Sequence, residues 1–203
     1  MLSYWERETF WNKPDVVVLG SGIVGLNAAI RLRQESPSLR VAVVERGFLP
    51  WGASTRNAGF ACFGSSSELL EDMSAQQADE VFERVELRWK GLAMLRSLLG
   101  DEAIRYEALG GYEIFTDNDL DVYGNCMERL AELNRRLAGI IGETVTYVPC
   151  DDQIQGFGFS QVRHMIRNNH EGQIDTGRMM QSLLELARSC GVDIYTGVRV
   201  DKV

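Results

Sequence analysis

Hydrophobic residues change their spacing twice in the N-terminal part of the chain. Asp15 to Leu19 is a short β-branched run, which is typical of a buried strand. From Ile23 the apolar residues follow helical spacing, and Pro37 cannot continue a helix, so we expect this helix to end near Glu35. Val41 to Glu45 is the next apolar run. This order predicts one βαβ unit.

The periodic pattern stops over residues 48–67 and then returns as a long helical one. Residues 48–67 are rich in Gly, Ser, Ala and Asn, which predicts a long loop with at most a short helix. The apolar residues beyond them recur at helical spacing, and Gly100 follows as a stop. They are Ala78, Val81, Phe82, Val85, Trp89 and Leu92. A long amphipathic helix is therefore expected.

A hairpin and a second long helix are predicted next. The runs Ile104 to Ala108 and Tyr112 to Thr116 flank Leu109-Gly110-Gly111, where glycine can supply the positive φ of a short hairpin turn. Asp117 or Asp119 can cap the helix that follows. Its apolar face and the glycine that ends it are Tyr123, Met127, Leu130, Leu137, Ile141 and Gly142.

The last third of the chain contains strands on either side of one more helix. Short strands are expected near Thr144 to Val148 and Gln161 to Arg167, and Asp175 or Thr176 can cap the helix. The residues that this helix buries and the glycine that stops it are Met179, Leu183, Leu186, Ala187, Cys190 and Gly191. The final strands are expected at Val192 to Thr196 and Val198 to Val203.

These elements define a fold class. The hairpin and helices of the middle region interrupt the alternation of strand and helix in a simple doubly wound sheet. We predict an α/β fold: a Rossmann-like βαβ sheet with an inserted α+β domain of the substrate-binding type, incomplete at the C-terminus. We assign residues 1–75 to the βαβ unit and its following loop, 76–170 to the inserted region, and 171–203 to the return into the first domain.

Composition and charge narrow the function classes. The net charge of −8 repels nucleic-acid phosphate and anionic lipid, and no apolar run is long enough to span a bilayer. We therefore expect a cytoplasmic protein with no nucleic-acid partner and no membrane span. Only His164 and His170 accompany the scattered cysteines, so we expect no metal site, surface histidines and buried, reduced thiols. The cysteines are Cys62, Cys126, Cys150 and Cys190.

Three glycines stand where the first strand meets the first helix. In the segment from Gly20 to Gly25, the first glycine permits a tight turn, Gly22 lets the backbone approach a pyrophosphate, and Gly25 allows close packing of helix on strand. The first helical residues, Ile23 and Val24, offer free N–H groups at the positive end of the helix dipole. The segment therefore predicts a dinucleotide site.

An acidic residue completes this pattern. Glu45 ends the second strand, 20 residues after Gly25, where a carboxylate can accept hydrogen bonds from the adenosine ribose. The same charge would repel a 2′-phosphate, which argues against NADP and leaves NAD or FAD.

The segments after Glu45 resemble a known family. Arg46-Gly47 and Gly52 to Phe60 resemble the loop after the second strand in FAD-dependent oxidoreductases of the D-amino-acid oxidase type, which include glycine, sarcosine and glutamylputrescine oxidases. Gly110 to Phe115 and Gly172 to Gly177 are also similar to recurrent segments of that family, so the resemblance covers most of the chain. It implies a flavoprotein that uses FAD.

The resemblance implies further cofactor contacts. In the family, this loop lies against the pyrophosphate, ribityl and flavin portions, and a strand that matches Arg199-Val200 presents backbone groups to adenine. The additional cofactor-binding residues that it implies are Arg46, Ser54, Thr55, Arg56, Asn57, Ala58 and Val200. Relatives that attach the flavin covalently through this loop have a histidine where Arg56 and Asn57 stand, so we expect non-covalent FAD.

The resemblance also implies a reaction, the oxidation of a small amine or amino acid by hydride transfer to flavin N5. The substrate-binding residues of such enzymes come from a C-terminal half, so no catalytic residue is assigned here. We expect this chain to be an N-terminal portion completed by a missing C-terminal half or a partner chain. Two alternatives stay open: a non-catalytic dinucleotide-binding module completed by a partner, and an NAD-dependent dehydrogenase.

Overall fold

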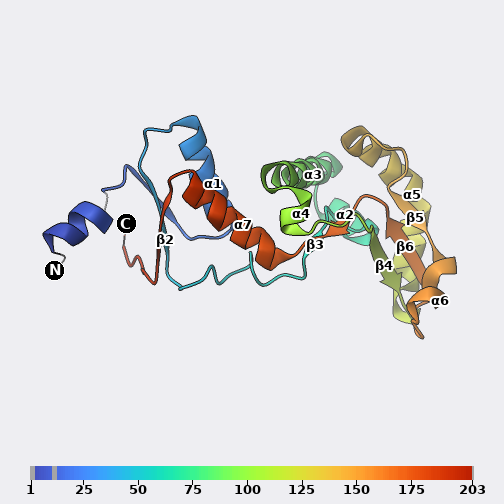
Figure 1. Ribbon diagram of the computed structural model, residues 1–203. Coiled ribbons are helices and arrows are strands. Elements are labelled where there is room, and N and C mark those ends of the chain that lie inside the picture. Colours follow the sequence, from blue (N-terminus) through green and yellow to red (C-terminus); the bar gives the residue numbers. More distant parts are fainter. Residues whose placement is uncertain (1–2, 11–12, 203) are drawn as a thin grey trace. The chain divides into compact units, whose positions relative to one another are not determined.

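The computed structural model describes residues 3–10 and 13–202, and the chain divides into two compact units (Figure 1). Unit 1 comprises residues 1–58 and 175–203, and unit 2 comprises residues 59–174. The sequence analysis had set the boundaries at 75/76 and 170/171. Residues 59–75 belong with unit 2 because Phe63, Leu69 and Leu70 are buried in its hydrophobic core.

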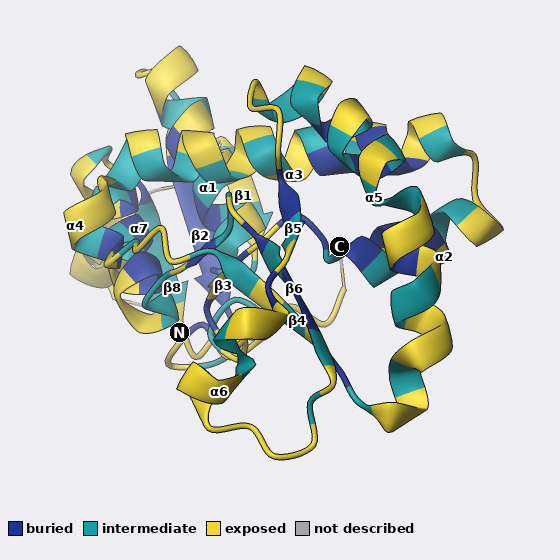
Figure 2. Ribbon diagram, turned by 90° about the vertical axis from the view of Figure 1, so that its right-hand side faces the viewer, coloured by how far each residue is buried: buried dark blue, intermediate teal, exposed yellow. Residues whose placement is uncertain are grey.

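Unit 1 contains a three-stranded parallel sheet in the order β1-β2-β8. Its strands are β1 (Val16–Leu19), β2 (Val41–Glu45) and β8 (Asp193–Thr196), and its α-helices are α1 (Ile23–Glu35) and α7 (Thr176–Ser189). The two helices pack side by side (Figure 1). Every residue of the central strand β2 is buried, as its dark blue colour shows in Figure 2. The predicted βαβ unit is confirmed.

Local signals at the ends of α7 work as expected. The Asp175 side chain accepts a hydrogen bond from the backbone N–H of Arg178 and so caps the helix, and Gly191 takes a positive φ of 78° just beyond it. The strand expected over Val198 to Val203 is wrong for residues 198–202, and Val203 lies outside the described residues. Gly197, at φ 73°, turns the chain out of the extended path of β8.

Unit 2 is an α+β structure built on an antiparallel sheet in the order β4-β6-β5. The strands of this sheet are β4 (Gly111–Phe115), β5 (Tyr147–Pro149) and β6 (His164–Asn168). A separate two-stranded pairing joins β3 (Phe60–Ala61) to β7 (Gly172–Gln173). The α-helices are α2 (Ser66–Ala75), α3 (Ala78–Leu99), α4 (Asp101–Ile104), α5 (Leu120–Ile141) and α6 (Ile154–Phe157). Short 3₁₀ turns are η2 (Asp117–Asp119) and η3 (Asp151–Gln153).

The hydrophobic core of unit 2 lies between this sheet and the helices α2, α3 and α5. It buries Phe63 before α2, Val85 on α3, Leu133 on α5 and Ile166 on β6. The two long helices predicted from hydrophobic spacing are α3 and α5, and both end at the glycine expected, Gly100 and Gly142. The buried face of α5 is centred on Cys126, Leu133 and Leu137, whereas Met127 is exposed.

The predicted hairpin over residues 104–116 is wrong. Ile104 ends the helical turn α4, and Glu107 forms a bridge with Gln173 instead of pairing with the next run. Gly110 does take a positive φ, 81°, but its N–H donates to the carbonyl oxygen of Glu171. Strand β4 then pairs with β6, so a long-range partner replaces the local one.

Two smaller expectations also change. The loop predicted over residues 48–67 contains β3 and ends in α2, which Ser65 caps by accepting from the N–H of Glu68. Thr116, rather than an aspartate, supplies the capping oxygen before α5, and Asp119 accepts in return from the Thr116 N–H.

The thiols and histidines are more varied than expected. Cys126 and Cys150 are buried and Cys190 is half-buried, but Cys62 is exposed. His164 is half-buried, stacks on Tyr123 and lies 2.7 Å from a carboxylate oxygen of Asp151. None of the helices in the described ranges combines the length and the apolar character needed to cross a membrane.

Candidate functional site

The glycine-rich turn of unit 1 leaves little space for side chains. Gly20 takes a positive φ of 95°, and its N–H donates to the carbonyl oxygen of Val44 over 2.8 Å. A Cβ on Gly25 would lie 2.1 Å from the carbonyl oxygen of Gly20, and a Cβ on Gly22 would lie 3.1 Å from Oγ of Ser54. The first contact is impossible for a real side chain, so the close packing of α1 on the end of β1 requires glycine at position 25.

The N-terminus of α1 carries the donors that an anion would use. Gly22 is the N-cap residue and provides no side-chain cap. The N–H of Ile23 donates to Oγ of Ser54 over 3.0 Å. The N–H groups of Val24 and Gly25 lie in the same first turn, where α-helix geometry supplies no intrahelical acceptor. The positive end of the helix dipole and these donors together favour a phosphate or another anion.

Glu45 stands beside this turn at the carboxyl end of β2, with only 7% of its surface exposed. Its Oε2 accepts from both the N–H and the hydroxyl of Ser21, each over 2.9 Å, and its Oε1 accepts from the N–H of Gly47 over 2.9 Å. Burial raises the pKa of this carboxyl, but the hydrogen bonds from Gly47 and Ser21 outweigh that effect and leave the pKa below its usual value. The residue is therefore a fixed carboxylate at neutral pH.

The loop after β2 is held by its own backbone. The N–H groups of Thr55 and Arg56 both donate to the carbonyl oxygen of Gly52, and the Thr55 hydroxyl donates to that of Pro50. The Asn57 amide donates to the carbonyl oxygen of Ala53 over 2.9 Å. These bonds form a tight turn that places Ser54 at the start of α1.

The other cofactor-binding residues expected from the sequence are less constrained. The side chains of Arg46, Arg56 and Ala58 are exposed, and Val200 is 43% exposed in a segment without strand structure. The N–H of Val198 donates to the carbonyl oxygen of Glu45, so the chain passes the end of β2 shortly before Val200. The structure thus brings the three glycines, Ile23, Glu45 and Ser54 together and leaves these four residues without a comparable role.

Sequence reasoning missed two residues of this arrangement. Ser21 is almost fully buried and contributes two of the three donors to Glu45, and Gly47 contributes the third. The available signal for Ser21 was its place between two glycines of the turn. The signal for Gly47 was a glycine two residues after the acidic one.

Comparison with known proteins places the chain in a family. The model of the FAD dependent oxidoreductase family, DAO, matches residues 15–203. Among curated proteins, a thiamine thiazole synthase from Yarrowia lipolytica is 27% identical over 157 residues, which cover 74% of this chain and 46% of that protein.

Solved structures share the fold. A glycine oxidase from Geobacillus kaustophilus aligns with a TM-score of 0.67 and 20% identity, over 92% of this chain and 47% of that one. An iminodiacetate oxidase from Chelativorans sp. BNC1 aligns with a TM-score of 0.59 and 20% identity, over 89% of this chain and 46% of that one. The chain spans about half the length of the proteins that it matches. Because the family model covers nearly all of it, the chain belongs to the DAO family of FAD-dependent oxidoreductases.

Proposed function

We propose that this chain is the N-terminal portion of an oxidoreductase that oxidises the C–N bond of a small amine or amino acid with FAD as the cofactor. The single observation that carries the proposal is the fixed Glu45 carboxylate beside a glycine-rich helix N-terminus, in a chain of the DAO family. Two proteins of similar fold are named as oxidases of glycine and of iminodiacetate, both amino acids, which supports the substrate class.

The proposed FAD contacts divide between two groups of residues. The pyrophosphate would lie at the N-terminus of α1, where Gly20, Gly22 and Gly25 permit close approach and the N–H groups of Ile23 and Val24 donate. The loop after β2 would cover the remainder of the cofactor. We assign to it Arg46, Ser54, Thr55, Arg56, Asn57 and Ala58, with Val200 beside the adenine.

The hydrogen bonds of Glu45 fit a ribose contact. A carboxylate has about four acceptor positions, and the two donors from Ser21 and the one from Gly47 use three of them. One ribose hydroxyl can take the remaining position on Oε1, and a second can replace the rotatable Ser21 hydroxyl on Oε2. Ser21 and Gly47 therefore orient the carboxylate without exhausting it.

Bound FAD would supply the acceptor for the hydride that leaves the carbon next to nitrogen. The residues of this chain would bind and orient the cofactor, and Arg56 would supply an exposed cation for a phosphate or the reduced flavin. We assign the inserted region, residues 76–170, to the substrate-type domain, and we name no catalytic side chain. We further propose that FAD is held without a covalent bond.

A spectrum and an activity assay of the full-length protein test this proposal. We expect visible flavin absorbance in stoichiometric amount, together with amine- or amino-acid-dependent reduction of that flavin. A colourless protein that NAD stabilises against heat would support a nicotinamide dehydrogenase and refute the FAD assignment. A yellow protein whose flavin no amine or amino acid reduces would instead support a non-catalytic dinucleotide-binding module.

A further inference from the structure

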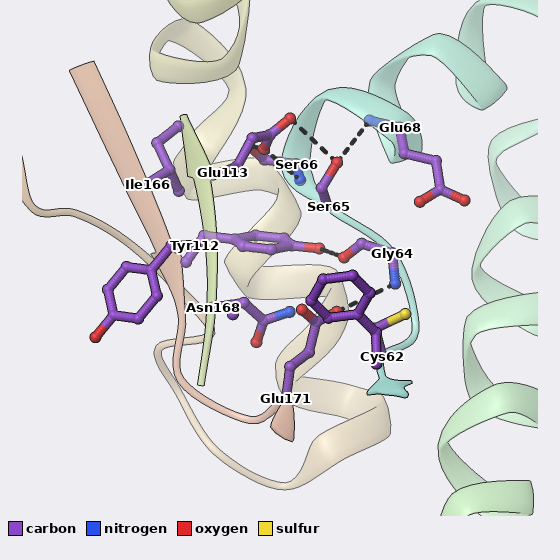
Figure 3. Close-up of a pocket in the computed structure, with 13 residues that line it drawn as sticks. Cys62, Gly64, Ser65, Ser66, Glu68, Tyr112, Glu113, Ile166, Asn168 and Glu171 are labelled. Carbon is purple, nitrogen blue, oxygen red and sulfur yellow. Dashed lines mark hydrogen bonds between the residues drawn. The ribbon is translucent and has the colours of Figure 1, made fainter. Parts of the chain in front are cut away.

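Unit 2 contains a cavity of about 260 Å³ that the proposed FAD contacts do not use (Figure 3). It lies between the sheet strands β4 and β6 and the segment that leads from β3 into α2. Tyr147 closes part of the wall, because its buried hydroxyl donates to the carbonyl oxygen of Gly64 over 2.6 Å. The cavity is therefore built from segments far apart in the sequence.

Asn168 presents an unused donor in this wall. Only 4% of the residue is exposed, and its Oδ1 accepts from the N–H of His170 over 3.0 Å. That bond fixes the orientation of the amide, because a flipped side chain would place a donor against a donor. The Nδ2 atom has no hydrogen-bond partner. A buried N–H without an acceptor is costly, so an acceptor inside the cavity would stabilise the protein.

Glu171 presents an acceptor beside this donor, and the two side chains point toward each other in Figure 3. Its Oε1 accepts from the N–H groups of Phe63 and Gly64, at 3.2 and 3.4 Å. No described residue donates to its Oε2. Burial raises the pKa of this carboxyl, and the two backbone donors oppose that rise. A cationic partner would favour the charged form.

The charges around the cavity select the sign of a ligand. Glu68, Glu113 and Glu171 line it, and its described lining includes no Lys, Arg or His. Glu113 has a structural role, since it accepts from the N–H groups of Ser66 and Ser67 at the start of α2. Glu68 pairs with Arg88 at 3.3 Å. Glu171 is therefore the carboxylate left to meet a ligand, and an anionic ligand would find no cation in the wall.

We propose that this cavity binds a small cationic amine that carries a neutral oxygen close to its nitrogen, as in an amino alcohol or an amino amide. The ammonium group would donate to Oε2 of Glu171, and the oxygen would accept from Nδ2 of Asn168. This is a binding site, and it requires no oxidation of the ligand. The proposal therefore stands or falls independently of the function proposed above.

Calorimetric titration of the full-length protein tests the site. Ethanolamine and glycinamide should bind saturably, ethylamine should bind several-fold more weakly because it offers no oxygen to Asn168, and glycolate should not bind. Glu171→Gln keeps a carbonyl oxygen for the N–H groups of Phe63 and Gly64 and removes the charge. It should weaken ethanolamine binding about tenfold or more, the effect of losing one charge-assisted hydrogen bond.

Glu107→Gln is the matched control, because Glu107 is exposed, accepts from the Gln173 amide and lies outside the cavity lining. It should leave ethanolamine binding unchanged. Circular dichroism of Glu171→Gln should show the wild-type fold, so that lost binding reports the charge. Absence of saturable binding to the wild-type protein would overturn the proposal, as would equal binding of glycolate or wild-type affinity in Glu171→Gln.

Discussion

Ser21 and Glu45 are joined by two hydrogen bonds, because both the N–H and the hydroxyl of Ser21 donate to Oε2 of Glu45 over 2.9 Å. The contact links the glycine-rich turn to the carboxyl end of β2 across 24 residues of sequence. Since Gly47 donates to the other oxygen, the carboxylate holds its orientation before any ligand arrives. The same bonds connect the stability of unit 1 to its proposed ligand site.

Glu45→Ala should therefore lower both stability and FAD affinity. The substitution leaves buried donors of Ser21 without an acceptor, at a cost of about 1–3 kcal/mol in the free energy of unfolding. Loss of the ribose contacts should weaken FAD binding about tenfold or more. Urea unfolding and titration of the full-length apoprotein measure the two effects.

Glu35→Ala is the control for this pair of measurements. Glu35 lies at the end of α1 in the same unit, and its exposed ion pair with Arg31 is worth little. It should leave FAD affinity unchanged. An unchanged dissociation constant in Glu45→Ala would remove Glu45 from the cofactor site.

The pH dependence of stability should carry the signature of Glu45. Its pKa is lower in the folded protein than the usual value of about 4.3, so its contribution is fully present above that value and is lost as pH falls through the folded pKa. The stability difference between the wild-type protein and Glu45→Gln should be constant near neutral pH and shrink in acid. Unfolding curves at a series of pH values measure it, and a difference that grows toward low pH would contradict the prediction.

Gly25→Ala should destabilise the protein, whereas Gly91→Ala should not. A Cβ at position 25 would meet the Gly20 carbonyl oxygen at 2.1 Å, so α1 or the turn must move, at a cost of about 1–3 kcal/mol. Gly91 lies inside α3 with nothing within 4 Å of its Cβ position, so alanine should stabilise by up to about 1 kcal/mol. Thermal unfolding of both variants gives the comparison. Equal melting temperatures would show that the turn tolerates a side chain.

Glu171→Gln should change stability in the opposite pH direction from Glu45→Gln. The pKa of Glu171 is raised by burial, so the stabilisation from its proton is present at low pH and is lost as pH rises through the folded pKa. The glutamine variant should therefore match or exceed wild-type stability at neutral pH in the absence of ligand. Chemical unfolding near neutral pH and in mild acid provides the test. A clear loss of stability at neutral pH would indicate that the charge is needed structurally.

The flavin should leave the protein on denaturation, since Arg56 and Asn57 occupy the loop positions at which covalently attached relatives are expected to have histidine. Acid precipitation of the full-length protein followed by a spectrum of the supernatant measures this. The yellow colour should be in the supernatant, and colour retained in the pellet would contradict the prediction.

Local signals in the sequence determined much of unit 1. The strand from Val41 to Glu45 is apolar along its length, and α1 and α7 begin and end at turn, cap or stop residues within a few positions of their own ends. Each of these signals acts between residues close in sequence, so it can be read from the chain alone. The glycine spacing and Glu45 are of the same kind, because β1, α1 and β2 follow one another directly.

Only the tertiary structure decided the partners of segments whose stability depends on distant residues. The polar start of α2 is stabilised by the Glu113 carboxylate, 47 residues away from Ser66, and β4 pairs with β6 instead of forming the local hairpin. Likewise the unpartnered amide of Asn168 meets the cavity only after β6 is in place. Hydrogen bonding and burial across such separations depend on the folded arrangement of the whole unit, and hydrophobic spacing along the chain records the buried face of a segment without naming what covers it.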